Sequence, residues 1–352
     1  MPKINELLKN RDKEFLDHDQ VFEGYPWIFE ENKNCIISPD SDGFMCGLLM
    51  SHFFNWNIKG FYDGKVMLYS QDVTPKDCIF LDIEIFSKKV RSVGQHCIIP
   101  SQDKYRELNL DGFDSCLSPG MLRGYDGRQN FQLKFPFGTI HFLISLLSKK
   151  REININREGI TSLLFVDGMF NVLFKYPENS LNWFNYLSFS DKKNPLNQFF
   201  YEHNFGLSEI MKLMDEYFKK RDSFGGEGRS DRGDHLIISD KNSKICNTYE
   251  RDELYFIEED WVKRMSGFIK MNADNIGWSF DPQKWTWGNF KAEIFEKRIL
   301  GGDNSFTLNN GGKTLALKNL ASYYEQGIVS NAQTSGGAIE YSVYKNNHYI
   351  FN

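Results

Sequence analysis

The chain has 352 residues, a length that corresponds to about two domains of ordinary size. It carries 42 Lys and Arg against 47 Asp and Glu, and this formal charge of −5 excludes a protein that coats duplex DNA by charge alone. Hydrophobic residues make up 41% of the chain and aromatic residues 15%, which excludes a mainly disordered protein.

The chain offers no sign of a membrane segment. It contains no run of about 18 apolar residues, and its charged N-terminus lacks the apolar core of a signal peptide. We therefore expect a cytoplasmic protein. The six cysteines are scattered and form no CxxC pair, so we expect free thiols rather than a zinc ribbon or a disulfide framework.

The first half of the chain alternates between short apolar runs and longer ones. Residues 44–54 are apolar on nearly all sides and predict a buried helix, and residues 137–148 predict another. Short apolar runs predict strands at 34–38, 56–62, 77–82 and 93–99. This order is typical of an α/β domain with a mostly parallel sheet and helices on both faces.

The segments after residue 99 are more varied in composition. Residues 100–135 are polar and Gly-rich and predict a long surface loop or insert, whereas residues 160–166 form a further apolar segment that we assign to the same sheet. Helices are predicted at 182–189 and 207–220. The predicted organisation is a lead-in at 1–33, an α/β domain at 34–222, a flexible linker at 223–234 and a smaller α+β domain at 235–352.

Four carboxylates and one histidine lie at or beside predicted strand ends: Asp40, Asp42, Asp82, His96 and Asp167. Polar groups just after the carboxyl ends of parallel strands line the ligand site in such sheets, so we expect these side chains to gather. Carboxylates and imidazole suit Mn²⁺, Mg²⁺ or iron better than a structural zinc.

Each of these residues also has a purely structural interpretation. Asp40 and Asp42 could form an ordinary turn, Asp82 could cap backbone groups, His96 could be a hydrogen-bonded core residue, and Asp167 could end a segment before a turn. Glu84, two residues after Asp82, could assist the site or be solvated.

A basic and aromatic stretch precedes the second predicted helix. Arg123, Arg128 and Lys134 flank Tyr125 and Phe131. Such an arrangement can hold a single strand by base stacking and phosphate contact, and we assign Arg123 and Arg128 to substrate binding. The alternative is a solvated loop.

The order of these motifs resembles the DHH phosphoesterase superfamily over residues 34–170. Ser38-Pro39-Asp40-Ser41-Asp42-Gly43 is similar to its first motif, His-x-Asp-x-Asp-Gly, with Ser38 at the His position. Asp82 resembles its second motif, an Asp at the end of an apolar strand, and Asp167 its fourth. Gly94-Gln95-His96 stands where the family has Asp-His-His and keeps only the last residue.

The resemblance implies a metal-dependent phosphoesterase. It would hydrolyse a phosphodiester or phosphoanhydride in a nucleotide, or in a short or single-stranded nucleic acid, with Mn²⁺ or Mg²⁺ as the cofactor. The metal would be held by Asp40, Asp42, Asp82, His96 and Asp167, with Asp82 and His96 as catalytic residues. One ion is expected over two, and a homodimer is compatible with this assignment.

The departures from the family pattern support an alternative. Ser38, Gly94 and Gln95 each replace a residue that binds metal in the family. The chain could therefore be a catalytically silent DHH-like domain that binds a nucleotide or a protein partner.

Overall fold

The computed structural model describes residues 13–97, 111–125, 131–203, 205–225, 233–300, 327–335, 338–345 and 350–351. Its α-helices are α2 (His18–Gly24), α3 (Ser41–Phe54), α4 (Pro119–Leu122), α5 (Thr139–Leu147), α6 (Gly159–Phe165), α7 (Met169–Lys175), α8 (Pro177–Tyr186), α9 (Leu207–Asp222) and α10 (Glu259–Ile276). Its strands are β1 (Asn34–Ile37), β2 (Asn57–Tyr62), β3 (Val66–Ser70), β4 (Ile79–Leu81), β5 (Ser92–Val93), β6 (Cys116–Leu117), β7 (Thr248–Arg251), β8 (Leu254–Ile257), β9 (Phe290–Leu300), β10 (Ile328–Ser335) and β11 (Ala338–Tyr344).

The strands join one mixed sheet in the order β10-β11-β9-β3-β2-β1-β4-β5-β6, with the β7–β8 hairpin attached to β9. The centre is parallel, because β1 pairs in parallel with β2 and β4, and β5 pairs in parallel with β4 and β6. The remaining strands continue the sheet in antiparallel pairing. The α/β fold class with a mostly parallel core is therefore confirmed.

The strand order reverses beside β1. The chain leaves β1 through α3 and returns on one side as β2, whereas β4 pairs with the other side of β1. In open α/β sheets, ligands bind in the crevice outside the carboxyl ends of the strands at such a switch point. The residues that follow β1 and β4 therefore occupy the position where this fold usually places a site.

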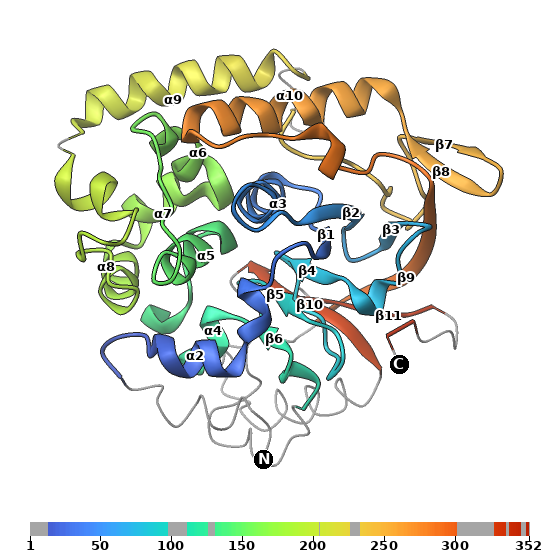
Figure 1. The fold of residues 1–352 in the computed structure, drawn as a ribbon, viewed down its shortest axis with the longest axis horizontal. Coiled ribbons are helices and arrows are strands. Elements are labelled where there is room, and N and C mark those ends of the chain that lie inside the picture. The colour runs from blue at the N-terminus through green and yellow to red at the C-terminus, as the bar shows by residue number, and fades with distance from the viewer. Residues whose placement is uncertain are drawn as a thin grey trace.

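One face of the sheet is covered by helices. Helix α3 is buried on nearly all sides because it packs against the strands and also contacts α5 and α10 (Figure 1). It begins at the N-cap Asp40, whose side chain accepts a hydrogen bond from the Gly43 amide, and it ends at Asn55 in the left-handed conformation. The predicted buried helix at 44–54 is confirmed.

The other face carries a separate apolar cluster. Ile36, Tyr62 and Phe80 from the central strands pack there with Phe295 and Val329 from the C-terminal strands. Strand β9 joins the two parts, since its first half pairs with β3 and its second half with β11. The C-terminal part is thus β-rich and covers this face of the sheet (Figure 1). Helices were expected on both faces, but in the described residues the apolar cluster of this second face is formed by strands and the loops beside them.

The structure of two segments differs from the prediction. The strand expected at 93–99 is present only as Ser92–Val93, because the chain then turns Gln95 and His96 toward a cavity; residues 98–99 lie outside the described ranges. The apolar segment at 160–166 is not part of the sheet but forms α6, which packs on α10. A short apolar run does not distinguish a buried strand from a buried helix.

Two further findings concern membrane helices and cysteines. Within the described ranges, no helix combines the length and the apolar character needed to cross a membrane. All six cysteines are thiols, and five of them are buried, whereas Cys246 is partly exposed.

Candidate functional site

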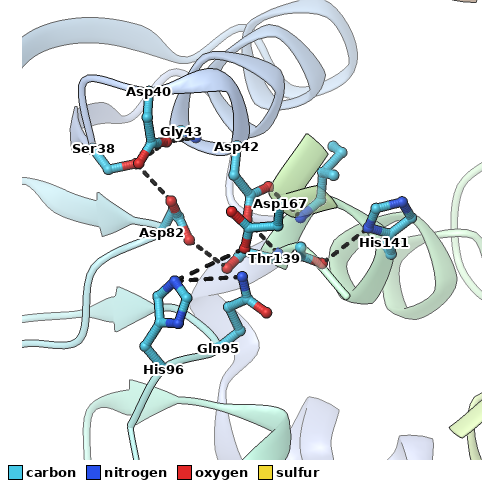
Figure 2. Close-up of polar contacts among 12 residues, drawn as sticks. Ser38, Asp40, Asp42, Gly43, Asp82, Gln95, His96, Thr139, His141 and Asp167 are labelled. Carbon is cyan, nitrogen blue, oxygen red and sulfur yellow. Dashed lines mark hydrogen bonds and ion pairs between the residues drawn. The ribbon is translucent and has the colours of Figure 1, made fainter. Parts of the chain in front are cut away.

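The five acid and histidine residues predicted to form a site gather at the carboxyl edge of the parallel strands (Figure 2). Asp40 and Asp42 follow β1, Asp82 follows β4, and His96 follows β5. Asp167 reaches the same place from the short turn between α6 and α7 rather than from a strand. The sequence analysis therefore identified the members of this cluster, although it placed Asp167 on the wrong kind of element.

Ser38 lies between two of the carboxyl groups. Its Oγ is 2.9 Å from Asp40 Oδ1 and 2.6 Å from Asp82 Oδ2. A hydroxyl carries one hydrogen, so it can donate only one of these bonds. Burial and the neighbouring charges of Asp42 and Asp40 raise the pKa of Asp82 well above its usual range, which favours a protonated carboxyl that can supply the other bond.

Asp42 caps a helix that lies far away in the sequence. Its Oδ2 accepts a hydrogen bond from the Thr139 amide at 2.5 Å, and its Oδ1 accepts one from the Ile140 amide at 3.0 Å. These are the first two residues of α5, whose own N-cap, Gly138, offers no side chain. Both oxygens of the fully buried Asp42 are therefore engaged in holding α5 against α3.

Asp82 is held by two hydroxyl groups in a strained backbone conformation. Thr139 Oγ1 donates to its Oδ1 at 2.7 Å, while Ser38 contacts its Oδ2. Its φ of 57° lies in the left-handed region, as does the φ of 51° at Asp167. Asp tolerates this region better than most residues, and such conformations cluster at functional sites. The sequence analysis did not identify Thr139, which carries no signal beyond its place at the start of an apolar segment.

The cluster is electrostatically strained. Burial raises the pKa of Asp42 to about 6, although the amides of Ile140 and Thr139 oppose the shift. The Asp167 side chain is 28% exposed, but it lies against the cluster, and burial together with the charges of Asp42 and Asp40 raises its pKa. No Lys or Arg of the described residues forms an ion pair with these four carboxyl groups.

His96 is neutral in this setting. Burial lowers the pKa of His96 to about 4, with Asp40 opposing the shift and Lys134 adding to it. Its Nε2 lies 3.8 Å from Asp167 Oδ2 and 3.5 Å from the Gln95 side-chain amide. A neutral imidazole that is only loosely held can act as a hydrogen-bond partner or as a ligand.

Glu84 explains the glycine at position 94. The Glu84 carboxylate is buried, and its Oε1 accepts a hydrogen bond of 2.7 Å from the Cys97 amide. A Cβ at Gly94 would lie 2.6 Å from that carboxyl group. Glu84 thus occupies the space that a side chain at 94 would need, and it is not a solvated residue.

A cavity of about 400 Å³ opens beside the acid cluster. Asp40, His96 and Asp167 line one part of it, and the aromatic residues Tyr125, Phe131 and Tyr176 line another, together with Lys134 and Asn179. Asn179 Nδ2 donates to the carbonyl oxygens of Phe131 and Lys134 at 3.1 and 2.8 Å, which fixes this segment. Three members of the predicted basic and aromatic stretch therefore meet the acid cluster.

Arg123, one of the two arginines assigned to substrate binding, does not line this cavity. Arg123 is buried, its guanidinium lies over the rings of Trp183 and Tyr186, and it donates to Asn182. It stabilises α4 against α8. The predicted substrate contact of Arg123 is therefore corrected to a packing role. Arg128 lies outside the described residues.

The donor set does not fit a metal ion as arranged. Both oxygens of Asp42 accept amide hydrogens, and both oxygens of Asp82 contact hydroxyl groups. In the part of the chain that the structure describes, no three His, Cys, Asp or Glu side chains are arranged to hold a metal. The hydroxyls and the α5 amides supply the polar contacts that a cation would otherwise provide.

No protein-family model matches the chain, and searches of the curated proteins and of the solved structures found no match either. The assignment of function therefore depends on the site itself.

Proposed function

We propose that the chain is a DHH-like α/β domain that binds a nucleotide in the cavity beside Asp40, His96 and Asp167 and does not hydrolyse it. One observation carries this proposal. Lys134 is half-buried and lines the cavity, yet no carboxylate of the described residues forms an ion pair with it, and burial alone lowers its pKa. A half-buried ammonium group without a partner is suited to an anion such as a phosphate.

The rest of the cavity supports the same ligand class. Tyr125, Phe131 and Tyr176 offer ring faces on which a base or ribose can pack. Asp40 and Asp167 carry acceptors for the hydroxyl groups of a sugar. The volume of about 400 Å³ lies within the usual range for small-molecule sites. As part of this proposal the protein acts in the cytoplasm.

The test is the binding of nucleoside 5′-monophosphates in the presence of EDTA, measured by isothermal titration calorimetry. Wild type should bind at least one of the four common nucleotides, and Lys134→Met should weaken that binding roughly tenfold, as expected for a charge-assisted contact. Lys192→Met, which removes an exposed ammonium group from another part of the surface, is the matched control and should change nothing. Wild type that binds none of the nucleotides would rule the proposal out.

The second candidate is a metal-dependent phosphoesterase, with Mn²⁺ or Mg²⁺ at the acid cluster. The raised pKa values of Asp42, Asp82 and Asp167 favour it, because a cation would relieve the repulsion among these groups. It would require Asp82 to leave Ser38 and Thr139.

The two candidates differ in their response to metal. The first predicts no specific rise in the thermal midpoint with Mn²⁺ or Mg²⁺ and no turnover of phosphodiester or pyrophosphate substrates. A Mn²⁺-dependent rise that is lost in Asp82→Asn, together with turnover in wild type alone, would favour the phosphoesterase.

A further inference from the structure

A second, smaller cavity adjoins the first on the side of the C-terminal strands. Its volume is about 200 Å³, and it lies between the carboxyl edge of the parallel strands and the β10–β11 hairpin. Asp40 and His96 line both cavities, so the two open onto the same group of side chains. From the hairpin, Asn331 and Tyr341 line the smaller cavity.

Asn331 is the unusual residue of this cavity. It is only 5% exposed, yet within the described residues neither its Oδ1 nor its Nδ2 has a hydrogen-bond partner. Buried amide groups are almost always paired, because removal from water is otherwise uncompensated. Asn272, on α10, shows the usual arrangement: it donates to the Phe268 carbonyl at 2.8 Å and accepts from the Tyr217 hydroxyl at 3.0 Å.

The backbone around Asn331 is well fixed. Asn331 pairs with Tyr341 in the β10–β11 ladder. The preceding residue, Ser330, bridges to Ile85 and lies 3.0 Å from the Tyr62 hydroxyl, so β10 is tied to the sheet on both sides. The unpaired carboxamide therefore belongs to a strand that is held in place, as expected of a group that recognises a ligand.

We propose that Asn331 recognises the base of the nucleotide through a pair of hydrogen bonds; this inference rests on the function proposed above. A carboxamide presents a donor and an acceptor side by side, and the edges of nucleobases present the complementary pair, such as N6–H and N7 of adenine. The nucleotide then extends from Lys134, at its phosphate, to Asn331, at its base, past the Asp40 and His96 that the two cavities share.

The test compares ligands with and without a base. Wild type and Asn331→Leu are titrated calorimetrically in EDTA with the four nucleoside 5′-monophosphates and with ribose 5-phosphate. In wild type, the best nucleotide should bind more tightly than ribose 5-phosphate. Asn331→Leu should weaken the binding of that nucleotide roughly tenfold, the loss expected for a bidentate contact. The affinity for ribose 5-phosphate should stay unchanged. Unchanged nucleotide binding in the variant would overturn the inference.

Stability separates recognition from a structural role. Asn331→Leu removes an amide that bonds to nothing in the described structure, so the urea midpoint of the free protein should not fall. Asn272→Leu is the matched control and should lower that midpoint, because it breaks two buried hydrogen bonds. An equal fall in both variants would mean that Asn331 is structural, which overturns the inference.

The inference and the proposed function fail differently. If Lys134→Met weakens the binding of all ligands while Asn331→Leu weakens the binding of none, the proposed nucleotide site is supported and the proposed role of Asn331 is wrong. If wild type binds ribose 5-phosphate as tightly as every nucleotide, the base is not recognised, and again only the role of Asn331 is wrong. If wild type binds none of the ligands, both are wrong.

Discussion

At the scale of single residues, the Glu84 carboxyl group makes the stability of the folded protein depend on pH. Burial raises the pKa of Glu84 from 4.5 to about 7, so the folded protein retains a proton that the unfolded chain has released between these values. The stability that Glu84 contributes is therefore full below about pH 4.5 and is lost as the pH rises through 7.

Glu84→Gln should accordingly raise the free energy of unfolding at pH 8 by about 3 kcal/mol, and the gain should vanish below pH 4. Glutamine has nearly the same shape and keeps an acceptor for the Cys97 amide. Urea unfolding at pH 4, 6 and 8 measures the difference. The lowered pKa of His96 acts in the opposite direction, but it is common to both proteins and cancels. A difference that does not vary with pH would contradict the expectation.

At the scale of elements, the contact between Asp42 and α5 joins two helices through one side chain. Asp42→Ala leaves the amides of Thr139 and Ile140 without acceptors, whereas Asp42→Asn removes the same charge and keeps one acceptor oxygen. Asp42→Ala should therefore be less stable than Asp42→Asn by about 1–2 kcal/mol in urea unfolding at pH 7. Hydrogen exchange at the two amides should also be faster in Asp42→Ala. Equal stability of the two variants would mean that Asp42 does not cap α5.

The same scale shows what the sequence could predict. The parallel core could be predicted from the sequence because β1, β2 and β4 are apolar runs that end at charged or polar residues. The same pattern predicted that Asp40 and Asp82 lie close together. Strand β5 was predicted only as part of a longer strand at 93–99, and β6 was not predicted, because a pair of residues leaves no pattern of its own. Thr139 was missed because its partner Asp42 lies 97 residues away in the sequence. Nothing in the composition around Asn331 distinguishes it from other polar strand residues.

At the scale of the whole molecule, β9 ties the C-terminal strands to the central sheet. A shared sheet predicts one cooperative unfolding transition, with equal calorimetric and van't Hoff enthalpies in differential scanning calorimetry. Phe295→Ala should lower the midpoint temperature of that single transition and reduce the free energy of unfolding by about 3–4 kcal/mol. The reason is that Phe295 is buried and packs against Tyr62 with ring centroids 5.1 Å apart. Two separate transitions would instead indicate that residues 235–352 unfold independently.

The buried thiols determine what happens after the protein unfolds. Five of the six cysteines are shielded in the folded state, and burial raises the pKa of thiols such as Cys35, Cys46 and Cys116, which keeps them unreactive. Unfolding exposes all of them at once and restores their ordinary acidity. In air, random disulfides would then form between chains and within them, so heat damage would become permanent without a reductant. The five buried thiols stay protected from oxidation as long as the core stays closed.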